Sequence, residues 1–208
     1  MGERYHQIAY GPHALARQRR AGSHVVYGDV GAQSDSGPDE LGDRELAFLR
    51  STFQFHLATV TDGGWPYIQY RSGPRGFVHH LGGNRIGFAD FDGNSQFVTV
   101  GNIEDNHRVA LFLADYPRRM RLKLFGHATV VDDDNQLLDE LATVPDGRVS
   151  ARAERSILID VEGIDWNCSR SLVPQYDRDY VRELNQANAR RVAELEQRIR
   201  DLEAGERE

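Results

Sequence analysis

Short runs of β-branched and aromatic residues alternate with Gly, Pro, Asn and Asp over most of residues 53–131. This pattern is typical of antiparallel hairpins, because the turn residues reach the positive φ angles that tight turns need. It predicts strands over residues 55–61, 67–72, 77–81, 85–91, 109–115 and 119–131. The strict alternation of Ile157, Ile159 and Val161 predicts one more strand over 152–164, with Trp166 following its end.

Several helices are expected around these strands. Residues 95–103 carry apolar positions at mixed spacing, which suits a helix as well as a strand. A helix is preferred, because Ser95 or Asn94 could cap it. Apolar spacing also predicts a helix over 43–50 capped by Asp43, and one over 132–141 whose first turn is capped by the aspartates at 132–134.

The two ends of the chain differ from its centre. A short strand is expected at 5–9, a helix from Pro12, and an exposed loop over 28–42, which has almost nothing to bury. We therefore divide the chain into an N-terminal extension (1–42), a central domain (43–174) and a C-terminal helix (175–208). The fold expected is mainly β within the α+β class, an antiparallel sheet closed into a small barrel with flanking helices.

The C-terminal helix is predicted to be long and amphipathic. From Asp179 onward, apolar residues such as Val181, Leu195 and Ile199 recur at steps of three and four. This apolar stripe could pack on a partner or along the central domain. Asn188 lies on the same face, where it could set the register of a helix pair or be exposed.

Composition narrows the classes of function. The chain has 208 residues and a formal charge of −7, which disfavours nucleic-acid binding. Cys168 is the single cysteine, so no disulfide can form within the chain. The longest apolar run, Val109–Ala114, is far short of the ~20 residues of a membrane span, and the N-terminus lacks the apolar segment of a secretion signal. We expect a cytoplasmic protein without a membrane partner.

Three features could bind an anion. Tyr67, Gln69 and Arg71 share one face of a strand and could hold a flat anionic ligand or simply face solvent. Residues 92–96 could seat a phosphate at a helix start or form an ordinary capped turn. The row of Arg119, Arg121 and Lys123 is self-repelling unless an anion or an acidic surface compensates it.

No catalytic or metal site is predicted. His79 and His80 point to opposite faces of their strand, and Cys168 has no evident His or Asp partner, so it is treated as a non-catalytic thiol. Nucleophile-elbow, zinc-protease, P-loop and dinucleotide motifs are absent from the sequence.

Four stretches in order resemble the pyridoxamine 5′-phosphate oxidase-related, FMN-binding split-barrel family, in particular its subgroup with a long C-terminal helix. They are FHLATVTDGGWPYIQYRSGPRGF, RIGFADFDGNSQFVTVGNI, NHRVALFLADYPRRMRLKLFGHATVV and DWNC, with VP five residues on. The resemblance covers residues 53–131 and 152–174 and implies a homodimer with FMN between the subunits. The residues it implies for cofactor binding are Gln69, Tyr70 and Arg71 at the flavin, Asn94, Ser95 and Gln96 at its phosphate, Arg121 and Lys123 at the ring or phosphate, and Trp166 and Asn167 closing the site.

The sequence also departs from that family. Ser95 and Gln96 stand where the oxidases have a basic pair at the phosphate, so Arg71 or the basic row would have to meet that charge. The loop after Asn167 differs as well, so pyridoxamine phosphate is not assumed as the substrate.

The resemblance implies an FMN-dependent oxidoreductase acting on an unidentified small molecule, in which Arg121 or Lys123 stabilises the anionic reduced ring. One alternative is a flavin- or haem-binding carrier or stress protein without turnover, in which His79, His80, His107 or His127 ligates iron. Another is a reductase that uses a deazaflavin.

Overall fold

The computed structural model describes residues 2–27, 36–149, 151–167 and 170–205. The chain forms two compact units, which are described separately. The first comprises residues 1–115 and 120–169, and the second comprises 116–119 and 170–208.

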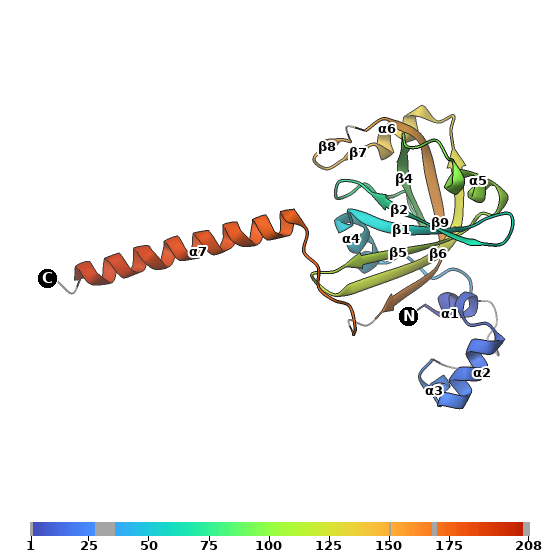
Figure 1. Ribbon diagram of the computed structural model, residues 1–208, viewed down its shortest axis with the longest axis horizontal. Coiled ribbons are helices and arrows are strands. Elements are labelled where there is room, and N and C mark those ends of the chain that lie inside the picture. The colour runs from blue at the N-terminus through green and yellow to red at the C-terminus, as the bar shows by residue number, and fades with distance from the viewer. Residues whose placement is uncertain (1, 28–35, 150, 168–169, 206–208) are drawn as a thin grey trace. The chain divides into compact units, whose positions relative to one another are not determined.

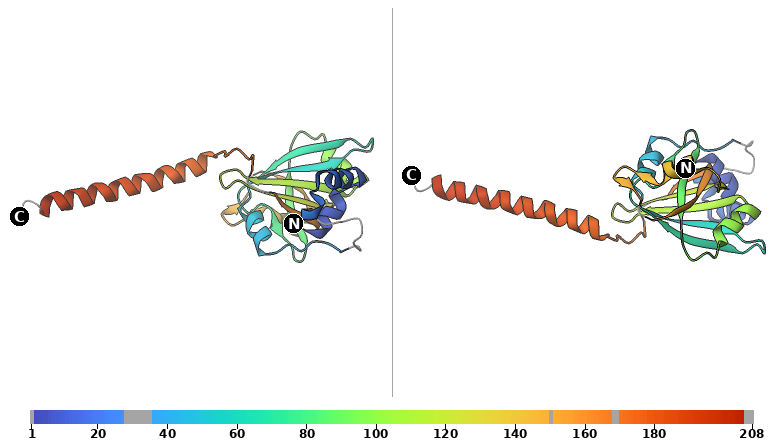
Figure 2. Two further views of the ribbon diagram at one scale, coloured as in Figure 1. Left: turned by 90° about the horizontal axis from the view of Figure 1, so that it is seen from below. Right: turned by 90° about the horizontal axis from the view of Figure 1, so that it is seen from above.

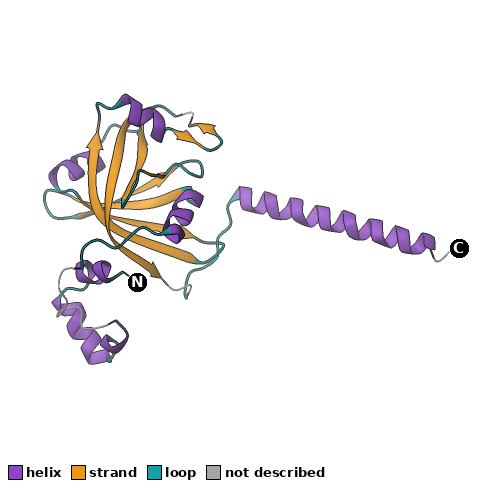
Figure 3. Cartoon of the chain, turned by 180° about the vertical axis from the view of Figure 1, so that it is seen from behind, coloured by secondary structure: helices purple, strands orange, loops and turns teal. Residues whose placement is uncertain are grey.

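The first unit is built on a seven-stranded antiparallel sheet in the order β2-β1-β5-β6-β9-β4-β3 (Figure 1). Its strands are β1 (Gln54–Val60), β2 (Pro66–Ser72), β3 (His79–His80), β4 (Arg85–Phe91), β5 (Arg108–Asp115), β6 (Met120–Val131) and β9 (Ala153–Asn167). The strands curve around a common core, as the views in Figures 2 and 3 show. The strand order has two ends, so β2 and β3 remain edges and the barrel is split rather than fully closed.

Every predicted strand of the barrel is confirmed, with two differences in extent. The segment predicted over 77–81 pairs only at β3. The last strand, β9, continues to Asn167 because its pairing with β6 persists to the pair of Arg121 and Asn167. The expectation that Trp166 follows the end of this strand was therefore wrong. A small hairpin of β7 (Thr143–Val144) and β8 (Gly147–Arg148) was not predicted.

Strand alternation builds the core. Along β1, buried and half-buried positions strictly alternate, so one face of the strand points into the barrel. The largest fully buried side chains are Phe55, Phe88, Leu57, Ile86, Ile103, Leu111, Leu113, Leu122, Leu124, Leu141, Ile157 and Ile159. Their close packing fixes the positions of the strand ends that carry polar residues.

Three helices flank the sheet: α4 (Asp43–Ser51), α5 (Val98–Asp105) and α6 (Asn135–Leu141). The cap predicted for α6 is confirmed, since the backbone N–H of Leu137 donates to Asp134 at 2.9 Å. Asp43 was wrongly predicted to cap α4. The N-cap is Gly42, whose N–H donates to the side chain of Glu45, and Asp43 is already helical.

The N-terminus is helical, in α1 (Glu3–Ala9), α2 (Pro12–Ala21) and α3 (His24–Tyr27). The helix predicted from Pro12 is confirmed, but the strand predicted over 5–9 was wrong. The carboxylate of Asp39 accepts hydrogen bonds from the backbone N–H groups of Arg4 and Tyr5, which caps α1. The ring of Tyr5 then stacks on Phe125 of β6 at 4.9 Å.

The segment 28–42 was predicted to be an exposed loop. Residues 28–35 lie outside the described residues, and residues 36–42 have no regular structure. Among residues 36–42 only Leu41 is buried; it is 6% exposed and its N–H donates to Asn84. This short stretch anchors the N-terminal helices to the barrel, since Asp39 also accepts from the N–H of Ile164.

The second unit contains one helix, α7 (Arg178–Gly205), which confirms the predicted C-terminal helix. Its first turn is capped by Asp177, which accepts from the N–H of Tyr180 at 2.8 Å. Within the described part of the chain, no helix combines the length and apolar character needed to cross a membrane.

Candidate functional site

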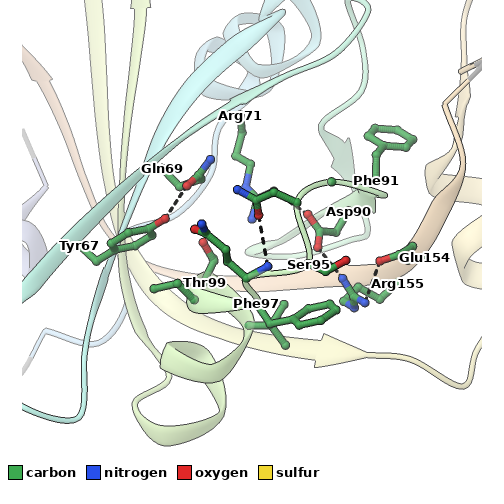
Figure 4. Close-up of a pocket in the computed structure, with 15 residues that line it drawn as sticks. Tyr67, Gln69, Arg71, Asp90, Phe91, Ser95, Phe97, Thr99, Glu154 and Arg155 are labelled. Carbon is green, nitrogen blue, oxygen red and sulfur yellow. Dashed lines mark hydrogen bonds and ion pairs between the residues drawn. The ribbon is translucent and has the colours of Figure 1, made fainter.

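A pocket of about 230 Å³ opens between β2, β9, the end of β4 and the first turn of α5 (Figure 4). Polar and aromatic side chains line it. They are Tyr67, Gln69, Arg71, Asp90, Phe91, Gly93, Asn94, Ser95, Gln96, Phe97, Val98, Thr99, Val100, Glu154 and Arg155. Three segments that lie far apart in the sequence, 67–71, 90–100 and 154–155, thus contribute to one site.

The β2 wall follows from strand alternation. Tyr67, Gln69 and Arg71 occupy the half-buried positions of this strand, while the residues between them are exposed. The hydroxyl of Tyr67 donates to the amide oxygen of Gln69 at 2.6 Å, which fixes the orientation of that amide. This row of side chains therefore forms one wall of the pocket.

A shared carboxylate joins three strands at the pocket. One oxygen of Asp90 accepts from Arg71 at 2.6 Å, and the other accepts from Arg155 at 3.0 Å. Asp90 is 5% exposed, so these ion pairs are shielded from water. Because β2 and β4 lie toward opposite ends of the strand order, the pair of Arg71 and Asp90 bridges the split of the barrel.

Arg155 has further acidic partners. Its guanidinium contacts Glu154 at 2.9 Å and Asp132 at 3.2 Å in addition to Asp90. Burial by itself would lower the pKa of Arg155, but the hydrogen bonds to Asp90 and Asp132 outweigh it and raise the pKa above its usual value. Arg155 is thus fixed and charge-compensated, and its guanidinium also lies 5.2 Å from the centre of the Phe97 ring.

Arg71 differs from Arg155 in one respect. Its Nε is buried and has no hydrogen-bond partner within the described part of the chain. A buried donor left unpaired costs about 1–3 kcal/mol. Because this nitrogen has almost no accessible surface, a ligand in the pocket would reach it only if the Arg71 side chain moved.

The loop before α5 is backbone-strained. Ser95 and Phe97 have φ angles of 54° and 52°, a region that non-glycine residues rarely occupy. The predicted cap was wrong: Asn94 accepts from the N–H of Gln96 within the loop, and α5 begins later, at Val98. No side chain caps the first turn of α5, whose residues line the pocket. Uncapped N–H groups at a helix start favour an anion.

Five of the residues implied for cofactor binding lie together in this pocket: Gln69, Arg71, Asn94, Ser95 and Gln96. Tyr70 does not. It occupies the opposite face of β2, is 49% exposed, and donates its hydroxyl to Gln54.

The basic residues of β6 lie outside the pocket. The Nζ of Lys123 contacts Asp165 at 2.8 Å and lies 4.8 Å from the Tyr5 ring, on the outer side of the sheet beneath α1. Burial by itself would lower the pKa of Lys123, but hydrogen bonds with Asp165 and Tyr5 raise it overall. Arg121 is paired in register with Asn167 on the same side. Arg119 is not part of this strand face, since it lies in the preceding turn with a φ of 56°.

Trp166 packs against the other side of β9. Its indole N–H donates to Glu45 of α4 at 2.5 Å, and its ring contacts Phe48 edge-on at 5.1 Å. The guanidinium of Arg44 covers the ring at 4.0 Å. Within one chain, Trp166 thus joins α4 to the barrel and does not line the pocket.

Sequence reasoning missed Asp90, Phe97, Glu154 and Arg155. Asp90 had a usable signal: it is an acidic residue inside an otherwise apolar strand, and such a charge must be paired when buried. No comparable signal marks Arg155 in the sequence, because strand alternation predicts which face of the strand its side chain occupies but not which residues it contacts.

Metal ligands are not gathered in the described residues. No group of three or more His, Cys, Asp or Glu side chains there could hold an ion. Cys168 lies outside the described residues.

Solved structures similar to this chain share low sequence identity with it. HupZ of Group A Streptococcus is 17% identical over 65% of this chain and 99% of its own, with a TM-score of 0.49. A putative pyridoxamine 5′-phosphate oxidase from Lactobacillus delbrueckii is 19% identical over 61% and 93%, with a TM-score of 0.46. General stress protein 26 from Bacillus anthracis is 16% identical over 58% and 88%, with a TM-score of 0.40. No curated protein matches the sequence.

The family comparison covers more than half of the chain. The sequence model described as pyridoxamine 5′-phosphate oxidase matches residues 41–167, which span the barrel from the segment before α4 to the end of β9. The chain belongs to the pyridoxamine 5′-phosphate oxidase family, and its mostly antiparallel split barrel is the fold of that family.

Proposed function

We propose that this protein is an FMN-binding oxidoreductase that acts on a small molecule and places the FMN phosphate in the pocket between β2 and α5. The family includes oxidoreductases, and the pocket contains donors suited to a phosphate. The observation that carries the proposal is the position of Arg71 in the pocket wall, together with the first turn of α5, which also lines the pocket and has no side-chain cap among the described residues.

The residues present fit a phosphate-bearing cofactor. Arg71 and the backbone N–H groups at the start of α5 would hold the phosphate, and Ser95 and Gln96 would add polar contacts. Phe97 is 51% exposed beside this seat, and an aromatic ring can cover an apolar part of a ligand. When bound, FMN supplies hydride-transfer chemistry. The chain's own residues bind and orient the cofactor, and no protein acid or base is assigned.

The size of the pocket favours a site shared between two subunits. Its volume of about 230 Å³ is below the roughly 300–1,000 Å³ of sites that enclose a whole ligand. It therefore suits the phosphate end, and the ring system needs further walls. We propose that a second subunit supplies them in a homodimer, with Arg121 and Asn167, which pair on the outer side of β6 and β9, reaching the cofactor of the partner.

An apolar face supports the homodimer. Ile68 on β2 is 64% exposed, and its neighbours across the sheet are Ala58 on β1 and then Ala110 on β5. Phe112 lies in the adjacent row beside His56, half-buried. These side chains point away from the barrel core, and a second copy would cover them.

The first experiment identifies the ligand. Purified protein should show a flavin absorbance spectrum, and mass spectrometry of the released ligand should give FMN. A Soret band would indicate haem, and a released deazaflavin would indicate the alternative reductase. Colourless protein that does not bind added FMN would overturn the proposal.

The second experiment tests the phosphate seat. We expect Arg71→Gln to weaken FMN binding about ten- to a hundredfold, because one charge-assisted hydrogen bond is lost. Riboflavin lacks the phosphate, so its affinity should change little. Arg85→Gln is the matched control, since Arg85 pairs with Asp160 on the exposed surface. Equal losses for FMN and riboflavin in Arg71→Gln would place the phosphate elsewhere.

A further inference from the structure

We propose that α7 pairs with α7 of a second copy of this chain as a parallel, in-register, two-stranded coiled coil. This inference goes beyond the flavin proposal and does not depend on it. It is carried by the heptad pattern of α7, the exposure of its apolar stripe and the placement of its charges.

The core positions of α7 repeat every seven residues. From Asn188 onward, steps of four and three alternate through Asn188, Val192, Leu195, Ile199 and Leu202. Continued toward the start of the helix, the same repeat passes through Asn185 and Val181, and the apolar Leu184 lies beside it at position g. This assigns Asn185, Val192 and Ile199 to position a, and Val181, Asn188, Leu195 and Leu202 to position d. A strict seven-residue repeat keeps such a stripe facing a partner helix along its whole length.

The apolar residues of this stripe are exposed in the single chain. Val192 is 53% exposed, Ile199 is 54% exposed and Leu202 is 63% exposed. In a helix pair these side chains would lose accessible apolar surface, which is favourable because that surface is removed from water. Contact of this stripe with a second apolar surface is therefore favourable.

The residue types select two parallel strands. In parallel dimers, β-branched residues at a combine with Leu at d. The C-terminal half of α7 has this combination, with Val192 and Ile199 at a and Leu195 and Leu202 at d.

The flanking charges select the same orientation. Arg191 and Arg198 occupy position g, and Glu196 and Glu203 occupy position e, each five residues later. In a parallel pair, each g residue faces the e residue of the next heptad on the other helix, so both arginines meet glutamates. In an antiparallel pair, g faces g and e faces e, so like charges would oppose each other.

Asn185 fixes the register. A polar amide at position a is costly unless it meets its own counterpart, and this occurs only when the two helices are aligned without a shift. Asn188 places a second amide one turn away. Sequence alone left open whether Asn188 sets a register or is exposed, and in the heptad assignment it lies within the core stripe.

The length of α7 makes the pair dependent on the rest of the protein. Its 28 residues make four heptads and span about 42 Å. Two isolated helices of this length would associate weakly. When the barrels to which they are joined also associate, the effective concentration of one helix near the other rises and favours the pair. The full chain is therefore the right material for its test.

Disulfide crosslinking tests the pairing and its direction. In full-length protein carrying Cys168→Ser, we expect Leu202→Cys to form a covalent dimer on mild oxidation, because identical d residues adjoin in a parallel pair. Gln197→Cys is the matched control, since position 197 lies on the outer face and should crosslink poorly. Equal crosslinking of the two variants, or none at 202, would overturn the proposal.

Charge exchange tests the interhelical ion pairs. Glu196→Arg with Glu203→Arg, and separately Arg191→Glu with Arg198→Glu, should each lower crosslinking through Leu202→Cys in the Cys168→Ser background. A mixture of the two proteins should crosslink mainly as mixed dimers, because opposite charges then meet. Crosslinking that ignores these changes would contradict the assigned pairs. Flavin content, measured on the same samples, should not change, so the outcome is independent of the flavin proposal.

Discussion

At the scale of single residues, the site depends on how Asp90 is shared. One buried carboxylate holds two guanidinium groups, those of Arg71 and Arg155, which are 20% and 13% exposed. In the proposed site, a phosphate at Arg71 would lie near the Asp90 carboxylate, and the two negative charges would repel each other. We therefore expect stability and anion binding to be opposed at this residue.

Asp90→Asn tests this opposition. The neutral amide keeps the shape but removes the charge, so we expect a loss of about 1–3 kcal/mol in the free energy of unfolding. Added FMN or inorganic phosphate should restore more stability to this variant than to the wild type, because a ligand that binds only the folded state stabilises it. Urea denaturation with and without each ligand measures both effects.

Asp160→Asn is the control for Asp90→Asn. Asp160 pairs with Arg85 at 2.7 Å, but both side chains are about half exposed, so the loss should be about 0–1 kcal/mol. No rescue by phosphate is expected for this variant. Equal behaviour of the two variants would show that Asp90 has no special role in the pocket.

His79 should make stability depend on pH. Burial lowers its pKa below the usual 6.5, although Glu140 and a contact with the backbone of Leu141 act in the opposite direction. The unfolded chain therefore binds a proton at higher pH than the folded chain does, and the free energy of unfolding should fall as the pH drops below 6.5.

Denaturation on either side of pH 6.5 measures this effect. His79→Gln should reduce the pH dependence without abolishing it, because burial also lowers the pKa of His6. Val78→Ala, a buried neighbour without a titratable group, should lower stability by a similar amount at every pH. An unchanged slope in His79→Gln would contradict the prediction.

At the scale of elements, the pairing of β6 with β9 is interrupted by a bulge in β9. The register with β9 shifts between Phe125 and Gly126, where a side chain at Gly126 would approach the carbonyl oxygen of Asp160 to 2.5 Å. The close approach of the two backbones at this point requires glycine.

Two glycine substitutions test whether position 126 requires glycine for steric reasons. Gly126→Ala should destabilise the protein by about 1–3 kcal/mol, because the backbone of β9 must move. Gly101→Ala should stabilise it by about 0.5–1 kcal/mol, because Gly101 lies inside α5 with no atom near the added methyl group. Chemical denaturation measures both, and a neutral Gly126→Ala would show that the bulge tolerates a side chain.

At the scale of the whole molecule, the two units differ in whether their apolar residues are buried. The buried hydrophobic core lies entirely in the first unit, among residues that precede α7. The second unit presents an exposed apolar stripe instead. The first unit thus has a hydrophobic core of its own, whereas the apolar residues of α7 are exposed.

A chain that ends after Pro174 tests this division. We expect it to unfold cooperatively at nearly the temperature of the full chain and to bind FMN with little change. It should dimerise more weakly, because the helix pair is lost. Calorimetry, FMN titration and sedimentation measure the three properties, and loss of the cooperative transition would show that α7 is part of the barrel fold.

The sequence by itself determined the strands of the barrel, the long C-terminal helix and half of the pocket. Strand alternation is a local property, so the shared face of Gln69 and Arg71 could be predicted from spacing alone. The heptads of α7 are local in the same sense. Local pattern failed at α1, where Tyr5 was placed in a strand, because the distant carboxylate of Asp39 stabilises a helix.

Only the tertiary structure decided which residues meet. Arg71 comes from β2 at one end of the strand order, Asp90 from β4 next to the other end, and Arg155 from a strand much later in the sequence. Their contact depends on how tightly the sheet curves, which the packing of the whole core sets and no short segment encodes. The same curvature sends Lys123 and Trp166 to places outside the pocket, so within one chain the implied site divides into separate groups.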